Sequence, residues 1–151
     1  MLDDDDRRLL RYLQDDPDLS LPDLSAVAGM GSGRASRRLD RLRAAGVLRG
    51  SRAVIDWRRL GYTVEVSLRI TLDKGAARAF DDFLSAARQV PEVVEIQTFL
   101  GRVDARLQVV ARDLADYRRL YREAILTLPH IADIESLLTV GTVKSDGRLP
   151  L

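Results

Sequence analysis

The stretch AGMGSGRASRRLDRLRAAG, residues 28–46, decides the fold of the N-terminal third of the chain. It opens with a short glycine-containing turn, and its remainder has the apolar spacing of a helix that buries Ala35, Leu39 and Leu42. Gly31 or Ser32 can cap this helix, and Gly46 can end it. The pattern therefore predicts a tight turn followed by a helix over about residues 32–45.

Two further helices are expected before this turn. The first begins after an aspartate cap in residues 3–6, where carboxylates accept free backbone N–H groups, and its apolar stripe is Leu9, Leu10 and Leu13. The second starts near Pro22 and stops at Gly29, with Leu24 and Val27 directed inward. Three short helices with a tight turn before the third predict a helix-turn-helix, in which the third helix is the recognition helix.

Positive charge is concentrated on this third helix and just after it. The formal net charge of the whole chain is only +1, and residues 53–151 carry 14 basic and 14 acidic residues. Between residues 34 and 52, by contrast, seven arginines stand against one acid, Asp40. Residues 3–23 hold eight aspartates and three arginines. The near-neutral total therefore hides a polarised N-terminal third.

These arginines allow two interpretations. Guanidinium groups bind phosphates and form bidentate hydrogen bonds with guanine, which on a recognition helix indicates DNA binding. The alternative is a solvated helix face paired with the N-terminal aspartates. Their place on the third helix favours DNA. The candidate DNA-binding residues on that helix are Ser32, Gly33, Arg34, Ser36, Arg37, Arg38 and Arg41. Of these, Ser32, Gly33, Arg34 and Ser36 lie near the helix start, where bases are usually read. The candidates for phosphate contacts are Arg43, Arg49 and Arg52.

The second half of the chain begins with VEVSLRITL, residues 64–72, in which every second residue is apolar. This alternation is the period of a half-buried strand. Three more strands are expected over residues 93–99, 105–111 and about 134–143, the first two of them joined by a hairpin-length connection at 101–104.

Two helices are expected between these strands. One covers about residues 76–87, with Phe80, Phe83, Leu84 and Ala87 inward. The other covers about residues 114–128, with Leu114, Tyr117, Tyr121, Ala124, Ile125 and Leu128 inward. The resulting order, βαββαβ, is that of the ferredoxin-like fold. Its helices cover one face of the sheet, so the other face needs solvent or a partner.

The chain is therefore expected to be an α+β protein of two domains. Residues 1–50 form the helix-turn-helix domain, residues 51–61 a linker, and residues 62–151 the ferredoxin-like domain. The sequence has no cysteine and one histidine, which excludes disulfides and thiolate metal sites and leaves no expected metal site. Its acidic start is unlike a signal peptide, and no window reaches the apolar length of a membrane span, so a cytoplasmic location is expected.

Short motifs along nearly the whole chain resemble the Lrp/AsnC family of bacterial and archaeal regulators. In the first half they are Leu2-Asp3, Asp6-Arg7, Leu10, Leu24, Gly29-Met30, Arg37-Arg38, Arg41-Leu42 and Ala45-Gly46-Val47-Leu48. In the second half they are Leu60-Gly61, Gly101 with Asp104, Leu128-Pro129 with Ile131, and Val143-Lys144. Their order and spacing carry the resemblance, since no single motif is specific.

The resemblance implies a winged helix-turn-helix and a C-terminal effector-sensing domain. It also implies dimers formed through the sheets, often assembled into octamers, and an amino acid or related small molecule as effector, with no cofactor. The effector residues implied are Leu100, Gly101, Arg102, Val103, Asp104, Ser136 and Leu138. In the turn at 101–104 a small residue allows an unusual backbone angle, and a carboxylate can receive a ligand ammonium. The alternative is an ordinary hairpin turn in which Asp104 bonds the backbone.

Four positions depart from the family pattern. Gly31 stands where relatives commonly have serine, and Leu100 and Ala105 where they often have threonine and tyrosine. His130, in a surface turn, stands where they usually have glycine.

Two other functions compete with a sequence-specific regulator. Sirohaem decarboxylases resemble the family in fold and size, but one histidine and no cluster of catalytic partners argue against an enzyme. An architectural DNA-binding protein without an effector would use the same arginines without sharp base reading.

Overall fold

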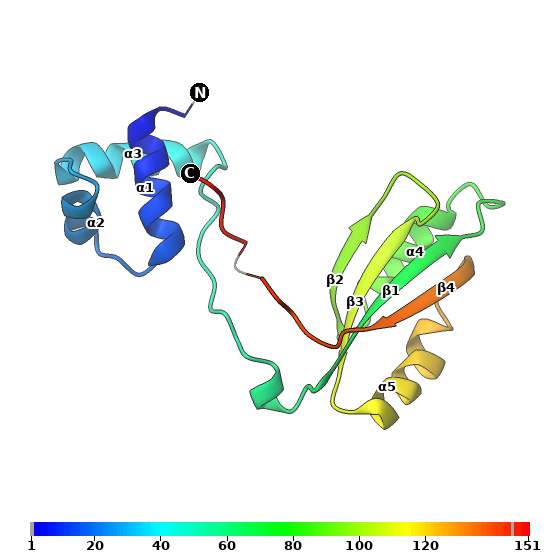
Figure 1. Cartoon of the computed structure of the whole chain (residues 1–151). Coiled ribbons are helices and arrows are strands. Elements are labelled where there is room, and N and C mark those ends of the chain that lie inside the picture. The colour runs from blue at the N-terminus through cyan, green and yellow to red at the C-terminus, as the bar shows by residue number, and fades with distance from the viewer. Residues whose placement is uncertain (1, 146) are drawn as a thin grey trace. The chain divides into compact units, whose positions relative to one another are not determined.

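The computed structural model describes residues 2–145 and 147–151 (Figure 1). The chain forms two compact units. The N-terminal unit comprises the residues up to Val54 together with the segment from Lys144 onward, and the C-terminal unit comprises Ile55–Val143. Among the described residues, no helix combines the length and the apolar character that crossing a membrane requires.

Three helices form the N-terminal unit: α1 (Asp4–Asp15), α2 (Leu21–Val27) and α3 (Ser32–Ala44). The aspartate cap of α1 is confirmed as a reciprocal capping box. The Asp3 carboxylate accepts from the Asp6 N–H at 2.9 Å, and the Asp6 carboxylate accepts from the Asp3 N–H at 3.3 Å. Gly29 takes a φ of +65° and ends α2 as predicted. Gly31 is the N-cap of α3, and no side chain caps that helix.

The small apolar core of this unit lies between the three helices. Its buried residues are Leu9, Leu24, Ala28, Ala35 and Leu39. The prediction that Val27 points inward is wrong, since that side chain is 47% exposed. The buried face of α2 is centred on Leu24 and Ser25, so Val27 lies beyond its edge.

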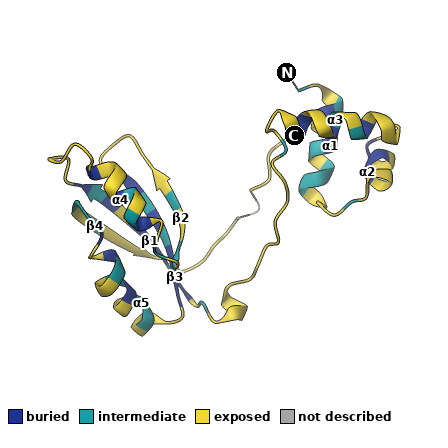
Figure 2. Cartoon of the chain, turned by 180° about the vertical axis from the view of Figure 1, so that it is seen from behind, coloured by how far each residue is buried: buried dark blue, intermediate teal, exposed yellow. Residues whose placement is uncertain are grey.

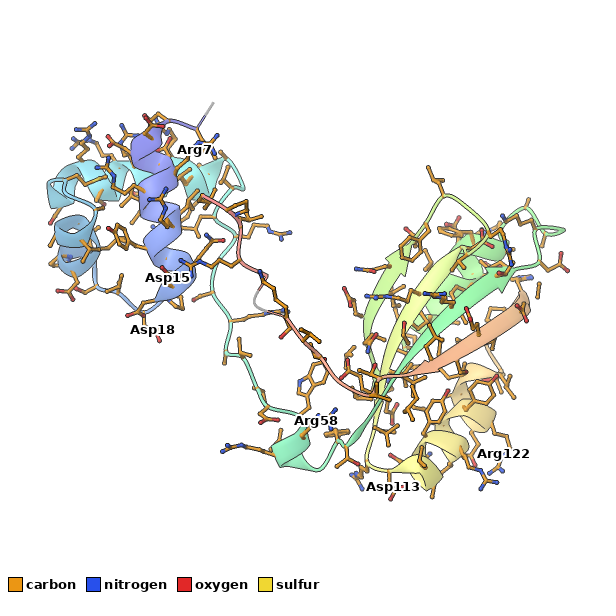
Figure 3. All side chains as sticks on the ribbon, in the orientation of Figure 1. Arg7, Asp15, Asp18, Arg58, Asp113 and Arg122 are labelled. Carbon is orange, nitrogen blue, oxygen red and sulfur yellow. The ribbon has the colours of Figure 1, made fainter. Side chains whose placement is uncertain are left out.

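The C-terminal tail contacts α1 rather than the ferredoxin-like sheet. Backbone N–H of Leu149 donates to Gln14 Oε1 at 2.7 Å, and Arg148 pairs with Asp15, which lies at the end of α1 (Figure 3), at 2.7 Å. These bonds group the tail with the N-terminal unit, whereas the sequence analysis assigned residues 62–151 to one domain. The functional limits 1–50, 51–61 and 62–151 stay a prediction.

The segment between α3 and the first strand is irregular. Extended pieces were expected over residues 47–55, and in the described chain no strand forms there. A 3₁₀ turn at Arg58–Leu60 follows, and Gly61, at φ +89°, ends it.

The C-terminal unit is a four-stranded antiparallel sheet with two helices. Its elements in chain order are β1 (Val64–Leu72), α4 (Ala79–Ala87), β2 (Val93–Thr98), β3 (Ala105–Ala111), α5 (Leu114–Leu120) and β4 (Ile131–Leu138). The strand order is β2-β3-β1-β4. This is the predicted βαββαβ ferredoxin-like unit, and the predicted α+β fold class is confirmed.

The alternating residues of β1 place one apolar set in the core. Val66, Leu68 and Ile70 are buried there against Phe83 of α4, Leu107 of β3 and Ile125, which follows α5. The remaining core members are Val64, Leu72, Ala87, Ala105, Val109, Ala111, Leu120 and Leu128.

Five expectations for this unit were wrong in detail: the start of α4, the end of α5, two inward positions and the bounds of β4. Helix α4 begins at Ala79 rather than near 76, and α5 passes at Tyr121–Ile125 into a π-helical turn instead of continuing to 128. Phe80 and Leu114, expected inward, are 40% and 58% exposed, and each lies in the first turn of its helix. Strand β4 runs over Ile131–Leu138 rather than 134–143, because its partner β1 pairs only as far as Leu138.

Both helices pack on one face of the sheet, and no described element of the C-terminal unit covers the other face, which we call the uncovered face (Figures 1 and 2). Side chains on the uncovered face pair across strands. Arg69 meets Glu135 at 3.3 Å, and Arg106 meets Glu95 at 3.1 Å. Gln108 donates to Glu65 at 2.6 Å. The uncovered face is therefore polar at its centre and self-complementary in charge.

Candidate nucleic-acid interface and ligand site

A cluster of charged side chains joins the first turn of α1 to one flank of α3. Its centre is Asp6, which is only 1% exposed. The Asp6 carboxylate accepts from Arg38 at 2.8 Å and from Arg41 at 2.6 Å. Arg38 also reaches Asp3 at 2.7 Å and Asp5 at 3.1 Å. Its side chain, 15% exposed, is thus held by three carboxylates.

These contacts shift the acidities of the groups that make them. The bond from Arg38, followed by that from the Asp6 N–H, lowers the pKa of Asp3 to about 2. Burial acts to raise the pKa of Asp6, but Arg38, the capping bond and Arg41 together hold that pKa below its usual value. The bonds from Asp3 and Asp6 in turn raise the pKa of Arg38. These directions keep Asp3, Asp6 and Arg38 charged at neutral pH.

Arg34 joins the same flank through an ion pair with Asp5. The structure therefore places three of the candidate DNA-binding arginines, Arg34, Arg38 and Arg41, against carboxylates of the N-terminal segment. This is the alternative arrangement that the sequence analysis weighed for the whole set. Arg34 and Arg41 remain 58% exposed, whereas Arg38 does not. We refer to these three arginines as the inner flank of α3.

A second face of α3 points away from both the core and the inner flank. Helical spacing i, i+3, i+4 and i+7 puts Gly33, Ser36, Arg37 and Asp40 together there. Arg37 is exposed and forms no hydrogen bond or ion pair with any other described residue. We call these four residues the outer stripe. Ser32, beside it, shares a hydrogen bond of 2.9 Å with Ser25 of α2.

The three remaining basic candidates lie at and beyond the end of α3. Arg43 pairs with Asp40 at 3.2 Å. Arg43 and Arg49 line an open hollow of about 410 Å³ together with Gly46, Leu48 and Gly50. Arg49 and Arg52 are exposed and have no partner among the described residues.

In the C-terminal unit, Asp104 is the buried acid of the candidate ligand site. It is 6% exposed, accepts from the Leu72 N–H at 2.9 Å and pairs with Lys74 at 2.9 Å. The bond from Leu72 and that from Lys74 lower the pKa of Asp104. Lys74, which the sequence analysis missed, thus occupies the place expected for a ligand ammonium. The one sequence signal for Lys74 was its position two residues after the end of β1.

The 101–104 turn does not depend on an unusual backbone angle at Gly101, which the sequence had led us to expect. Gly101 does not use a left-handed backbone angle, and a Cβ added there would meet no described atom within 4 Å. The Arg102 carbonyl accepts from Thr71 at 3.1 Å. Leu100 is fully exposed, and Val103 is half-buried. The hairpin is therefore fixed by bonds to β1 rather than by glycine.

The last two candidate ligand residues lie elsewhere on the sheet. Ser136 pairs with Leu68 and Leu138 with Val66, whereas Asp104 is bonded to Leu72 at the end of β1. At 3.3 Å per residue, the positions along β1 differ by about 13 and 20 Å. Ser136 accepts instead from the Tyr117 hydroxyl at 3.3 Å. One chain alone does not bring these residues to Asp104.

Comparison with known proteins identifies both units. A winged helix-turn-helix DNA-binding family model matches residues 2–49, and a model of the Lrp/AsnC ligand binding domain matches residues 65–149. The chain belongs to the Lrp/AsnC family. The leucine-responsive regulatory protein of Klebsiella pneumoniae is 32% identical to it over 148 residues, which cover 98% of this chain and 90% of that protein.

Solved structures agree with this membership. An AsnC family transcriptional regulator from Agrobacterium tumefaciens is 30% identical, with a TM-score of 0.89 over 99% of this chain and 97% of that chain. A transcriptional regulator from Neisseria meningitidis, in complex with L-Met, has a TM-score of 0.92 over 99% of this chain and 97% of that one. At 24% identity, the latter likeness shows the fold alone. This Lrp/AsnC member is thus a DNA-binding transcriptional regulator with a C-terminal ligand-binding domain.

Proposed function

We propose that this Lrp/AsnC regulator binds its operators as a homodimer through α3 and responds to an amino acid or a related small molecule. The observation that carries the DNA part is the outer stripe. There the recognition helix presents Arg37 to solvent with no protein partner among the described residues. A guanidinium free of protein contacts is available for guanine O6 and N7. The place of action is the compartment that holds the chromosome, the cytoplasm.

The candidate DNA-binding residues divide into three roles under this proposal. Arg37, Ser36, Gly33 and Ser32 meet base edges at the start of α3. Phosphates are contacted by Arg43, Arg49 and Arg52, and by the donors that Arg34 and Arg41 leave unused. Arg38, enclosed by three carboxylates, positions α3 on α1.

The effector part of the proposal rests on Asp104 and Lys74. A ligand ammonium would replace the Lys74 ammonium, which is on an exposed side chain, while the bond from Leu72 keeps the carboxylate charged. Leu100, Gly101, Arg102 and Val103 border that position. Because Ser136 and Leu138 lie farther along the sheet, they would complete the site from a second protomer. The Klebsiella relative is named leucine-responsive, and the Neisseria protein was solved with L-Met, which supports an amino-acid class of ligand.

The homodimer would form through the uncovered face of the sheet. That face pairs Arg69 with Glu135 and Arg106 with Glu95, and the buried Arg106 Nε lacks a partner in the described chain. The sheet of a second protomer would supply a hydrogen-bond acceptor for this Nε. Assembly of dimers into octamers is the family's pattern. Light scattering at micromolar concentration should give a dimer or a larger assembly, and a monomer would contradict this part.

DNA binding is tested with genomic fragments at several salt concentrations. Arg37→Ala should reduce affinity for selected fragments and lower the slope of log affinity against log salt by about one. Arg122→Ala, which removes another exposed arginine, beyond α5 (Figure 3), is the matched control and should change neither. An Arg37→Ala protein with unchanged affinity and slope would refute the assignment. Equal affinity for all fragments would favour an architectural protein.

The effector is tested by thermal unfolding with each of the twenty amino acids, since a ligand that binds only the folded state raises its stability. One or a few should raise the melting temperature. Asp104→Asn should abolish that rise. A Lys74→Met protein should retain the rise, because the competing ammonium has been removed. The effector proposal fails if no amino acid has an effect.

A further inference from the structure

Asp40 is the one acidic member of the outer stripe. Its side chain is 69% exposed, and its described contact is Arg43, one turn later, at 3.2 Å. An ion pair this exposed contributes little to stability. Asp40 also repels phosphates on the face that approaches DNA. Neither folding nor general DNA affinity therefore accounts for a carboxylate at this position.

The surroundings of Asp40 place it for base contact. It lies three residues after Arg37 and seven after Gly33. Homeodomain recognition helices contact the major groove with residues at the same i, i+3, i+4, i+7 spacing. Opposite this stripe, Ala35, Leu39 and Leu42 are buried, so α3 is held with the stripe outward. The arginines of the inner flank are already paired with carboxylates of the N-terminal segment, and among the described residues the outer stripe has no such pairing.

We infer that Asp40 is a specificity-determining residue that accepts a hydrogen bond from cytosine N4 in the major groove, next to a guanine bound by Arg37. Carboxylates in the major groove select cytosine because its N4 amino group is a donor with no acceptor on the same base, whereas adenine N6 lies beside the acceptor N7. This inference rests on the proposed function of α3. The repulsion of phosphates weakens binding to all DNA, and the bond to cytosine N4 offsets this loss only at the selected site, so the carboxylate favours that site over others.

The spacing on the helix limits where the two bases lie. Three residues of an α-helix rise about 4.5 Å, and base pairs are stacked about 3.4 Å apart. The guanine and the cytosine should therefore lie on neighbouring base pairs or about two apart in each half-site.

The test is selection from a randomised duplex pool, followed by affinity measurements on the selected site and on single-base variants. The wild-type protein should prefer cytosine at one position by about 5- to 150-fold over other bases. Asp40→Ala should lose that preference and bind unrelated DNA more tightly. Asp40→Asn should shift the preference toward adenine, which an amide can bind through N6 and N7.

Arg43→Ala is the matched control, because it breaks the Asp40–Arg43 pair and leaves the carboxylate. It should weaken binding to all sequences and keep the cytosine preference. If Arg43→Ala loses the preference as Asp40→Ala does, Asp40 acts only by orienting Arg43 and the inference is wrong. The inference also fails if Asp40→Asn selects the same site as the wild type.

Failure of the proposed function gives a different result. In that case the wild-type protein selects no sequence at all, or Arg37→Ala leaves its affinity unchanged. Circular dichroism of each variant verifies that α3 is folded. Because Asp40 is exposed, its substitution should change the stability of the helix little.

Discussion

The two units of this chain are held together by different interactions. The central core cluster of the C-terminal unit has fourteen buried apolar residues among its described residues. The core cluster between the helices of the N-terminal unit has five, and this unit adds the Asp6 cluster, in which carboxylates of the N-terminal segment hold the inner flank of α3. A small three-helix unit has too little apolar surface for a large core. Charge thus contributes to fixing the orientation of the recognition helix, whereas the ligand-binding unit is held mainly by apolar packing.

The largest effect is expected from the core of the C-terminal unit. Phe83→Ala should lower its free energy of unfolding by about 3–5 kcal/mol, because the side chain is fully buried between α4 and the sheet. Denaturant unfolding followed by the fluorescence of Trp57, the only tryptophan, measures this. A loss below about 1 kcal/mol would show that the core is not packed as described.

Removal of the buried acid should have the next largest effect. Asp6→Asn leaves Arg38 and Arg41 without their central partner and should destabilise the N-terminal unit by about 2–3 kcal/mol. Hydrogen exchange with mass spectrometry resolves the two units and should show faster exchange in α1 and α3 only. Asp40→Asn, which alters an exposed acid of the same helix, is the control and should leave exchange unchanged.

A fall in pH should weaken the same cluster and destabilise the N-terminal unit. The folded-state pKa of Asp3 is about 2, below the usual 3.8. A lowered carboxylate pKa contributes stability above the unfolded-state value and loses it as pH falls through the folded-state value. The contribution of Asp3 should therefore be complete above about pH 4 and gone near pH 2. A pH series of α1 exchange rates measures this, and Asp3→Asn should flatten the dependence. An unchanged profile would rule out the pairing with Arg38.

The smallest effect should come from a turn of the C-terminal unit. His130 has a φ of +63°, which strains a residue with a Cβ. His130→Gly should stabilise the unit by about 0.5–1 kcal/mol, after allowance for the greater freedom of glycine in the unfolded chain. His130→Ala retains the Cβ and should give no gain. A stabilised alanine variant would instead point to the contact of His130 with Asp82.

The elements of both units could be predicted because each has a strong local period. The alternation in residues 64–72 matches β1 to the residue, and the apolar spacing around Leu39 matches the buried face of α3. Gly29 marked the turn, since its positive φ suits glycine. These features depend on residues that are near one another in the chain.

The partners of the charged side chains could be predicted only as an alternative. Asp6 and Arg38 are 32 residues apart, and only the packing of α1 on α3 brings them together. Lys74 likewise meets Asp104 because the end of β1 and the 101–104 turn lie at the same end of the sheet. The end of β4 escaped prediction for a similar reason: apolar residues continue to Val143, but the ladder with β1 ends at the Val66–Leu138 pair, close to the start of β1 at Val64.

The most direct test of the division of α3 is a nuclear magnetic resonance titration of the arginine Nε–Hε signals with operator DNA. We expect the Arg37 signal to shift and broaden, and the signal of Arg38, whose side chain is enclosed by Asp3, Asp5 and Asp6, to stay unchanged. A shift of the Arg38 signal as large as that of Arg37 would contradict this division, since it would show that DNA breaks the ion pairs between Arg38 and the carboxylates.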